Sequence, residues 1–151
     1  MKTLLTTIQT RLRAQLTDIR DGDIFIAPHI NFLPGGVKAP AIGIKDGAVT
    51  VVELGGAMQE THLRVHMVVW VGLPAGEDMI IGRTGQKGVL DRAADLHGAL
   101  GQHLLGIDGM ISAGPIDEAE SELFGDGKGR SLIRKIITYA YEKEEPLWGT
   151  D

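Results

Sequence analysis

The feature that most constrains the fold is residues 61–73, in which every second residue is apolar. These apolar residues are Leu63, Val65, Met67, Val69, Val71 and Leu73. Because side chains alternate between the two faces of a strand, the pattern predicts one long β-strand with one face against a core. The intervening positions are polar from His62 to His66 and apolar at Val68 and Trp70. The second face of this strand is therefore expected to be exposed to solvent near His62 and buried near Trp70.

Two segments with the period of an amphipathic helix accompany this strand. Their apolar stripes are Leu5, Ile8, Leu12, Leu16 and Ile19 in the first, and Val89, Ala93, Leu96, Leu100 and Leu104 in the second. Steps of three and four residues place each set on one side of a helix, so the sequence predicts helices over residues 5–19 and 89–104. Gly22, which follows the first helix, suits the left-handed conformation that often ends a helix.

Several shorter extended segments predict the remaining strands. They are residues 24–26, 40–44, 48–54, 110–113 with a continuation past Pro115, and 131–143. Asp46-Gly47 lies between two of these segments and predicts a hairpin turn. Pro115 marks a sheet edge or a bulge. Residues 28–40 read as a long irregular loop and residues 144–151 as a frayed tail.

The order of the expected elements defines the fold class. Helix, strands, helix and strands again predict an α+β protein with a mixed, mainly antiparallel sheet flanked by two amphipathic helices. The 151 residues suit one domain, so we expect a single domain over residues 1–151.

Composition excludes several classes of function. The net charge of −5 argues against direct nucleic-acid recognition, which normally uses a basic surface. The chain has no cysteine, which excludes disulfides and thiolate metal sites. No apolar run approaches the ~20 residues that cross a bilayer, and the N-terminus lacks the apolar centre of a signal peptide. These features predict a soluble protein of the cytosolic type, without membrane contact.

Two glycine-rich segments have features of an anion-binding site. Residues 125–131 contain Lys128 and Arg130 but lack the spacing of a phosphate-binding Walker loop, so a mobile hairpin tip is the favoured interpretation. Residues 82–88 lead into the second predicted helix, whose N-terminus is able to hold an anion. A flexible connection is the favoured interpretation there too, because the flanking pattern does not predict the βαβ unit of a dinucleotide-binding fold.

The titratable residues predict no catalytic or metal site. His62 and His66 share a strand face but lie about 13 Å apart, too far to share a metal ion. His97 and His103 are expected on different faces of the second helix. The acidic residues Asp117, Glu118, Glu120 and Glu122 read as a solvated or partner-facing strand. We therefore expect no enzyme activity, no cofactor and no metal.

The order of elements resembles that of phage tail terminator and tail completion proteins. The segments that carry the resemblance are residues 5–19, the Pro-x-Ile-x-Ile strand at 40–44, the alternating strand at 63–73, the helix at 89–104 and the closing hairpin at 110–143. They cover nearly the whole chain, but they form a pattern without an invariant motif, and the family supplies no catalytic residues to carry over.

The resemblance implies a phage or prophage structural protein of the virion tail, assembled in the bacterial host cytoplasm. Such a protein forms a homo-oligomeric ring, a hexamer by resemblance, that caps the tail tube, ends tube polymerisation and offers a docking surface to the head connector protein. Its partners would be copies of itself, the tail tube protein and the head connector. Another head–tail joining (neck) protein and a small-molecule-binding enzyme domain stay open as alternatives.

The residues themselves suggest where such an assembly would form contacts. Val68 and Trp70 make a half-apolar sheet face that either a helix or a neighbouring subunit would cover. Lys128 and Arg130 are placed to meet acidic groups of an adjacent subunit. We predict these four residues as an assembly interface, and we expect the glycine-rich segments 34–36 and 125–129 to become ordered on assembly.

Overall fold

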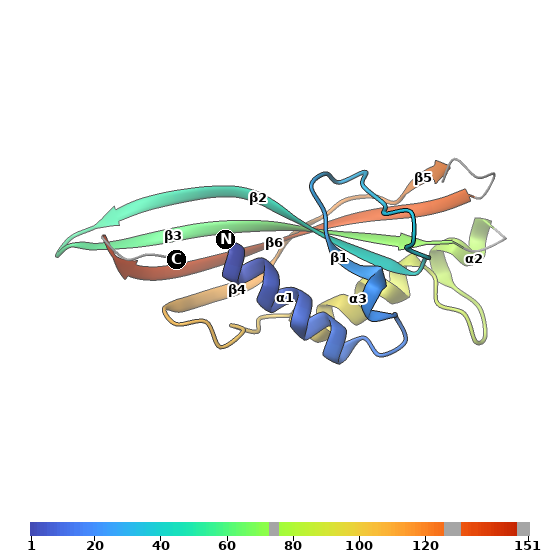
Figure 1. The fold of residues 1–151 in the computed structure, drawn as a ribbon, viewed down its shortest axis with the longest axis horizontal. Coiled ribbons are helices and arrows are strands. Elements are labelled where there is room, and N and C mark those ends of the chain that lie inside the picture. Colours follow the sequence, from blue (N-terminus) through green and yellow to red (C-terminus); the bar gives the residue numbers. More distant parts are fainter. Residues whose placement is uncertain (73–75, 126–130, 148–151) are drawn as a thin grey trace.

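One mixed β-sheet organises the fold (Figure 1). The computed structural model describes residues 1–72, 76–125 and 131–147. In this part of the chain the elements are α1 (Lys2–Gln15), η1 (Asp21–Asp23), β1 (Ile24–Ile26), β2 (Ala41–Leu54), β3 (Met58–Val71), α2 (Gly76–Ile81), α3 (Val89–Leu100), β4 (Met110–Glu118), β5 (Glu122–Gly125) and β6 (Ser131–Pro146). The strand order is β1-β2-β3-β6-β4, and β5 pairs with β6 beyond the end of β4. Only β1 and β2 are parallel, so the predicted α+β class with a mainly antiparallel sheet is confirmed.

The two longer helices, α1 and α3, pack against one face of the sheet. Most residues of their stripes are buried against the odd-numbered residues of β3 and β6, and Ile8, Leu12 and Leu96 are fully buried. Each such leucine or isoleucine stabilises the fold by ~1.5–3 kcal/mol through burial. Most of the predicted stripe residues therefore belong to the main core. The prediction is wrong for Leu104, which is 41% exposed, and Leu5 is only partly buried, whereas its neighbour Leu4 is buried. None of the helices in the described part of the chain is long and apolar enough to span a membrane.

A loop, residues 27–40, covers one end of the opposite face; we call it the strap. Beneath it Phe25, Val68, Trp70 and Leu132 form a second, smaller core. Asp23 ties the strap down, because its carboxylate accepts hydrogen bonds from Arg20 at 2.7 and 2.9 Å and from the Lys38 backbone N–H at 3.1 Å. The hydrogen bond from Arg20 lowers the pKa of Asp23 and outweighs the opposing effect of burial.

The prediction of a hairpin turn at Asp46-Gly47 is wrong. β2 continues through these residues with a bulge between Asp46 and Val49, and the turn to β3 lies at residues 55–57. Gly47 serves the bulge: a Cβ atom there would lie 2.7 Å from the Arg64 carbonyl oxygen. The glycine thus permits a close approach between two backbones, a common reason for glycine inside a strand.

Other boundaries also differ from the predictions. α1 and α3 end at Gln15 and Leu100, before the last apolar residue of each stripe, and Gly101 with φ of 35° follows α3. β6 extends to Pro146, so residues 144–146 belong to a strand and not to a tail. The expectation for Pro115 is confirmed, since β4 lies at the sheet edge and is bulged between Pro115 and Asp117. Helix α2 and strand β5 were not predicted.

Candidate functional site

Val68 and Trp70, two of the predicted interface residues, lie inside the subunit. They are 1% and 2% exposed, under the strap and beside Leu132 and Phe124. The Trp70 and Phe124 rings meet edge to face, with centroids 5.7 Å apart. The cover of this sheet face is therefore a loop of the same chain. A contact of these two residues with another subunit would require the strap to move, and their role in assembly stays a prediction. Lys128 and Arg130 lie outside the described residues.

A buried arginine completes this second core. The guanidinium of Arg134 stacks on Phe124, 4.1 Å from the ring centroid, and donates a hydrogen bond to Glu122 at 2.9 Å. It also donates to the side-chain oxygen of Asn31 in the strap. The Nε atom of Arg134 and the indole N–H of Trp70 are buried without a hydrogen-bond partner. Arg134 therefore links β6 to β5 and the strap, at the cost of unsatisfied buried donors.

The acidic segment serves two purposes. Glu118 accepts a hydrogen bond from His97 at 2.7 Å and pairs with Lys135 at 3.4 Å, and Glu122 pairs with Arg134. Asp117 and Glu120 are exposed. Two of the four acidic residues in this segment, Glu118 and Glu122, are thus engaged within the subunit, and only the other two fit the prediction of a solvated or partner-facing strand. Sequence spacing could not reveal these ion pairs, because the partners lie on other elements.

A hydrogen-bonded chain of three side chains connects α3 to two strands. His97 Nδ1 lies 2.6 Å from the Tyr139 hydroxyl, and Nε2 lies 2.7 Å from the Glu118 carboxylate. With a neutral imidazole, Nε2–H donates to Glu118 and Nδ1 accepts from Tyr139. Burial, with the nearby charge of Glu118, raises the pKa of Tyr139 to about 12. The phenol therefore keeps its proton at neutral pH and has no access to solvent, so this chain fastens the helix to the sheet and offers no reactive group.

His62, like His97, lies beside carboxylates. Its Nε2 atom lies 2.7 Å from Glu60, and its Nδ1 atom lies 3.8 Å from Glu142 on β6. The three side chains offer ligand atoms within 4.8 Å of one another, close enough for a divalent cation. They are only partly buried, and the same arrangement is an ordinary ion pair when His62 is protonated. His66 instead bonds the Thr138 hydroxyl at 2.8 Å. The spacing of Glu60 and His62 along one strand was the signal that sequence reasoning passed over.

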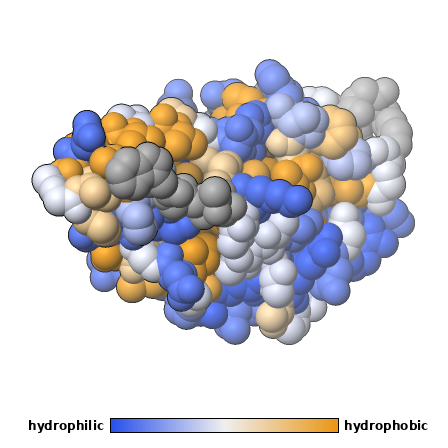
Figure 2. Space-filling model, turned by 60° about the vertical axis from the view of Figure 1, so that its left-hand side comes forward, coloured by the Kyte–Doolittle hydropathy of each residue, from blue (hydrophilic) through white to orange (hydrophobic). Residues whose placement is uncertain are grey.

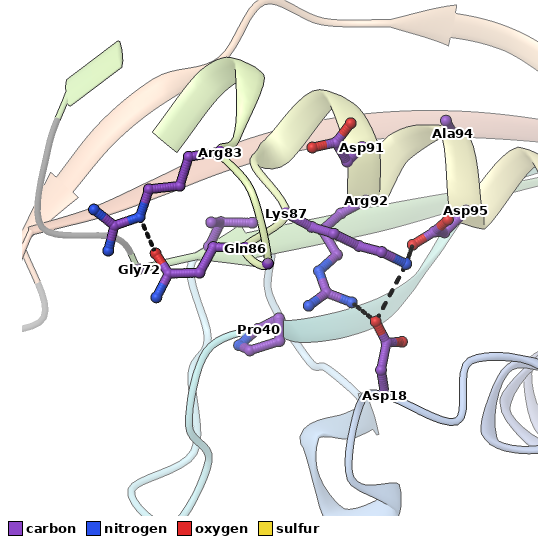
Figure 3. A pocket seen from close by; sticks show the side chains of 12 residues that line it. Asp18, Pro40, Gly72, Arg83, Gln86, Lys87, Asp91, Arg92, Ala94 and Asp95 are labelled. Atoms are coloured by element: carbon purple, nitrogen blue, oxygen red, sulfur yellow. Dashed lines mark hydrogen bonds and ion pairs between the residues drawn. The ribbon is translucent and has the colours of Figure 1, made fainter. Parts of the chain in front are cut away.

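A cavity of about 780 Å³, lined by both charged and apolar residues, lies where the 82–88 segment enters α3 (Figure 3). Lys87 and Arg92 point toward Asp18, at 3.3 and 2.6 Å, and Lys87 also contacts Asp95 at 2.7 Å. Burial raises the pKa of Asp18, but the hydrogen bonds and charges of Arg92 and Lys87 outweigh it and hold that pKa below its usual value. The cations of the cavity are therefore largely neutralised by its own carboxylates.

The N-terminus of α3 is also neutralised by a carboxylate of the chain, which leaves no place for an added anion. Asp91 reaches back and accepts a hydrogen bond from the Gly88 backbone N–H at 3.0 Å, as the third residue of a capping box does. A carboxylate of the chain thus occupies the position where an anion would meet the helix N-terminus. The interpretation of residues 82–88 as a connection fits this geometry better than a phosphate site. The connection is a hydrogen-bonded turn, in which the backbone N–H groups of Arg83 and Gln86 each donate to the carbonyl oxygen of the other residue.

Comparison with known proteins gives a result from structure and none from sequence. No protein-family model matches the chain, and no curated protein sequence is significantly similar to it. Among solved structures, a chain of the "Virion of native gene transfer agent (GTA) particle" is similar, with a TM-score of 0.63 and 14% identity. The similarity covers 94% of this chain and 95% of that chain. At such low identity, the comparison shows that the two chains share a fold.

Proposed function

We propose that this protein is a structural subunit of a phage-like particle, which forms a ring on the end of the tail tube. The ring ends tube polymerisation and provides the surface that joins the tail to the head connector. One observation carries the proposal: a chain of a gene transfer agent virion shares the fold over nearly its full length. The resemblance of the element order to tail terminator proteins narrows the role to this position in the tail.

The candidate sites favour a structural role over catalysis. Within the described residues, the cations Lys87 and Arg92 of the cavity beside α3 are paired with Asp18, and Tyr139 is fully buried in the core. We therefore propose that the protein is not an enzyme and requires no cofactor. Its proposed partners are copies of itself, in a hexamer, together with the tail tube and head connector proteins. Its proposed location is the virion tail, after assembly in the bacterial cytoplasm.

Deletion of the gene in particle-producing cells tests this role directly. Without a tail terminator, tube polymerisation has no stop, so electron microscopy should show tubes of irregular and excessive length without heads. Loss of a neck protein instead would leave tails of normal length that lack heads. Normal particles from the deletion strain would overturn both structural roles and favour the enzyme alternative.

A further inference from the structure

The sheet has two long edges without a strand beside them. β1 covers the outer edge of β2 at residues 42–44, and within the described residues no strand pairs with the outer side of residues 45–54. The outer edge of β4 is likewise unpaired in the described part of the chain. Both edges lie at the borders of the sheet in Figure 1. Such edges present free backbone N–H and C=O groups that are able to pair with another strand, except at Pro115 of β4, which has no N–H.

The two free edges lie on opposite sides of the sheet and at the same level along the strand direction. Following the pairing across the strands, Lys45 lies beside His66, His66 beside Thr138, and Thr138 beside Asp117. A second row runs from Thr50 through His62 and Glu142 to Ser112. Each row crosses the sheet from the free part of β2 to β4.

The strand directions permit these edges to pair in a closed ring. Each of the pairs β2–β3, β3–β6 and β6–β4 is antiparallel, so β4 runs opposite to β2. In a ring whose axis follows the strands, every subunit keeps the same orientation. The β4 edge of one copy would then approach the β2 edge of the next in the antiparallel sense, and one heterologous contact would repeat until the ring closes.

The side chains along the two edges are also complementary. Lys45 and Asp117 end the same row, so they lie on the same face with opposite charges. Within its own subunit Lys45 pairs with Asp46, so the contact with a second copy would add to this pair or replace it. Exposed apolar side chains lie along both edges: Val49 (51% exposed), Val51 (54%), Ile111 (48%) and Ile116 (52%). With the β2–β3 hairpin end turned forward, Figure 2 shows hydrophobic side chains at the surface among hydrophilic ones. Residues 48–52 carry no charge, and the charges of this edge lie on either side of them, at Lys45, Asp46 and Glu53. The middle of the edge therefore lacks the charge that usually prevents unwanted pairing.

We propose that the free edge of β2, residues 45–54, binds the outer edge of β4 of a second copy of this chain in an antiparallel ladder. The sheets of neighbouring subunits then join into one continuous surface around the ring. This inference rests on the proposed ring assembly and deepens it, because it names the two strands in contact. Lys45 of one copy meets Asp117 of the next.

Charge reversal tests the register of this contact. Lys45→Glu or Asp117→Lys alone puts like charges opposite each other and should weaken association roughly tenfold. In a one-to-one mixture the two variants can alternate, so that every contact again joins opposite charges, and assembly should recover. A loss of folding would not be repaired by mixing, and circular dichroism of each variant serves as the control. Recovery supports the contact, and a mixture as weak as its components contradicts the Lys45–Asp117 pairing.

Cysteine cross-linking provides the decisive experiment, because the natural chain has no cysteine. Opposed residues of neighbouring strands lie within disulfide reach. The double variant Thr50→Cys/Ser112→Cys should give a ladder of covalent oligomers on oxidation, whereas a mixture of the two single variants should give covalent dimers alone. Val52→Cys/Ser112→Cys tests a register shifted by two residues, as ring closure by a staggered sheet would require.

The outcomes separate this inference from the proposed function. If the unmodified protein forms rings but neither double variant gives a ladder, the ring exists and the β2–β4 contact is wrong. If the unmodified protein stays monomeric at high concentration and in the presence of tail tubes, the proposed function fails and the contact with it. Dimers from a single variant alone would indicate a two-fold contact and overturn the head-to-tail arrangement.

Discussion

The two faces of the sheet are covered in different ways. On one face α1 and α3 bury a continuous set of aliphatic side chains and the aromatic rings of Tyr139 and Tyr141. On the other, the irregular strap covers a smaller core with a buried arginine, Arg134, beside it. A helix satisfies its own backbone hydrogen bonds, whereas an irregular loop needs side chains for this purpose. Asp23 and Arg134 supply those contacts to the strap.

This difference predicts how each face responds to truncation of a buried side chain. The helix-covered core is closed by regular elements that cannot move far, so a cavity there would persist. The strap has few backbone hydrogen bonds to the sheet, and it is able to settle into a space left beneath it. We therefore expect the same truncation to cost more free energy of unfolding on the first face than on the second.

The largest expected effect comes from Leu96→Ala. Leu96 is fully buried between α3 and the sheet, so its truncation should lower the free energy of unfolding by about 3 kcal/mol. Leu132→Ala removes the same atoms from the core beneath the strap and should cost about 2 kcal/mol or less, because the strap is able to collapse. Urea denaturation of both variants measures the difference. Equal losses would show that the strap is as rigid as the helices.

A smaller effect is expected from two substitutions of Arg134. Arg134→Ala removes the stacking on Phe124 and the bonds to the strap and should cost about 2 kcal/mol. Arg134→Met keeps most of the packing volume and removes the unsatisfied Nε donor, so it should cost less than about 1 kcal/mol. Glu122 stays half exposed in both variants and tolerates the loss of its partner. If both variants lose the same free energy, the ion pairs and not the packing hold this region.

The helix-covered face is also the part that the sequence predicts best. Period-2 and 3.6 patterns identify Val65, Met67 and Leu96 as core residues without any knowledge of their partners. The same patterns identify Val68 and Trp70 as apolar but leave their cover open between a helix and a neighbouring subunit. The actual cover, the strap, has no periodicity, because its residues are placed by individual contacts such as that between Lys38 and Asp23.

Local signals mislead where a tertiary contact decides the conformation. Asp46-Gly47 carries a turn signal, yet the glycine is needed for the close approach to Arg64 in a bulged strand. The candidate assembly edges were equally hidden, since a free edge is known only once every strand has its neighbours. Likewise, the engagement of Glu118 with His97 joins residues 21 positions apart and follows from topology alone.

The smallest expected effect concerns His66, where the second face changes from wet to dry. Burial, then the charges of Lys45 and Arg64, lower the pKa of His66, and Asp46 opposes them only in part. The folded protein thus resists protonation of His66, whereas the unfolded chain accepts this proton near the ordinary pKa of 6.5.

The free energy of unfolding should be constant above that pH and fall as the pH drops below it, because the unfolded state binds the additional proton. His66→Gln, which keeps a partner for the Thr138 hydroxyl, should flatten the dependence of Tm on pH below the ordinary pKa of 6.5, whereas His62→Gln should leave that contribution in place. The window is separate from that of Glu118, whose pKa is lowered from 4.5 by the hydrogen bond from His97 and whose contribution is lost only at lower pH. An unchanged slope in the His66→Gln variant would assign the titration to another group.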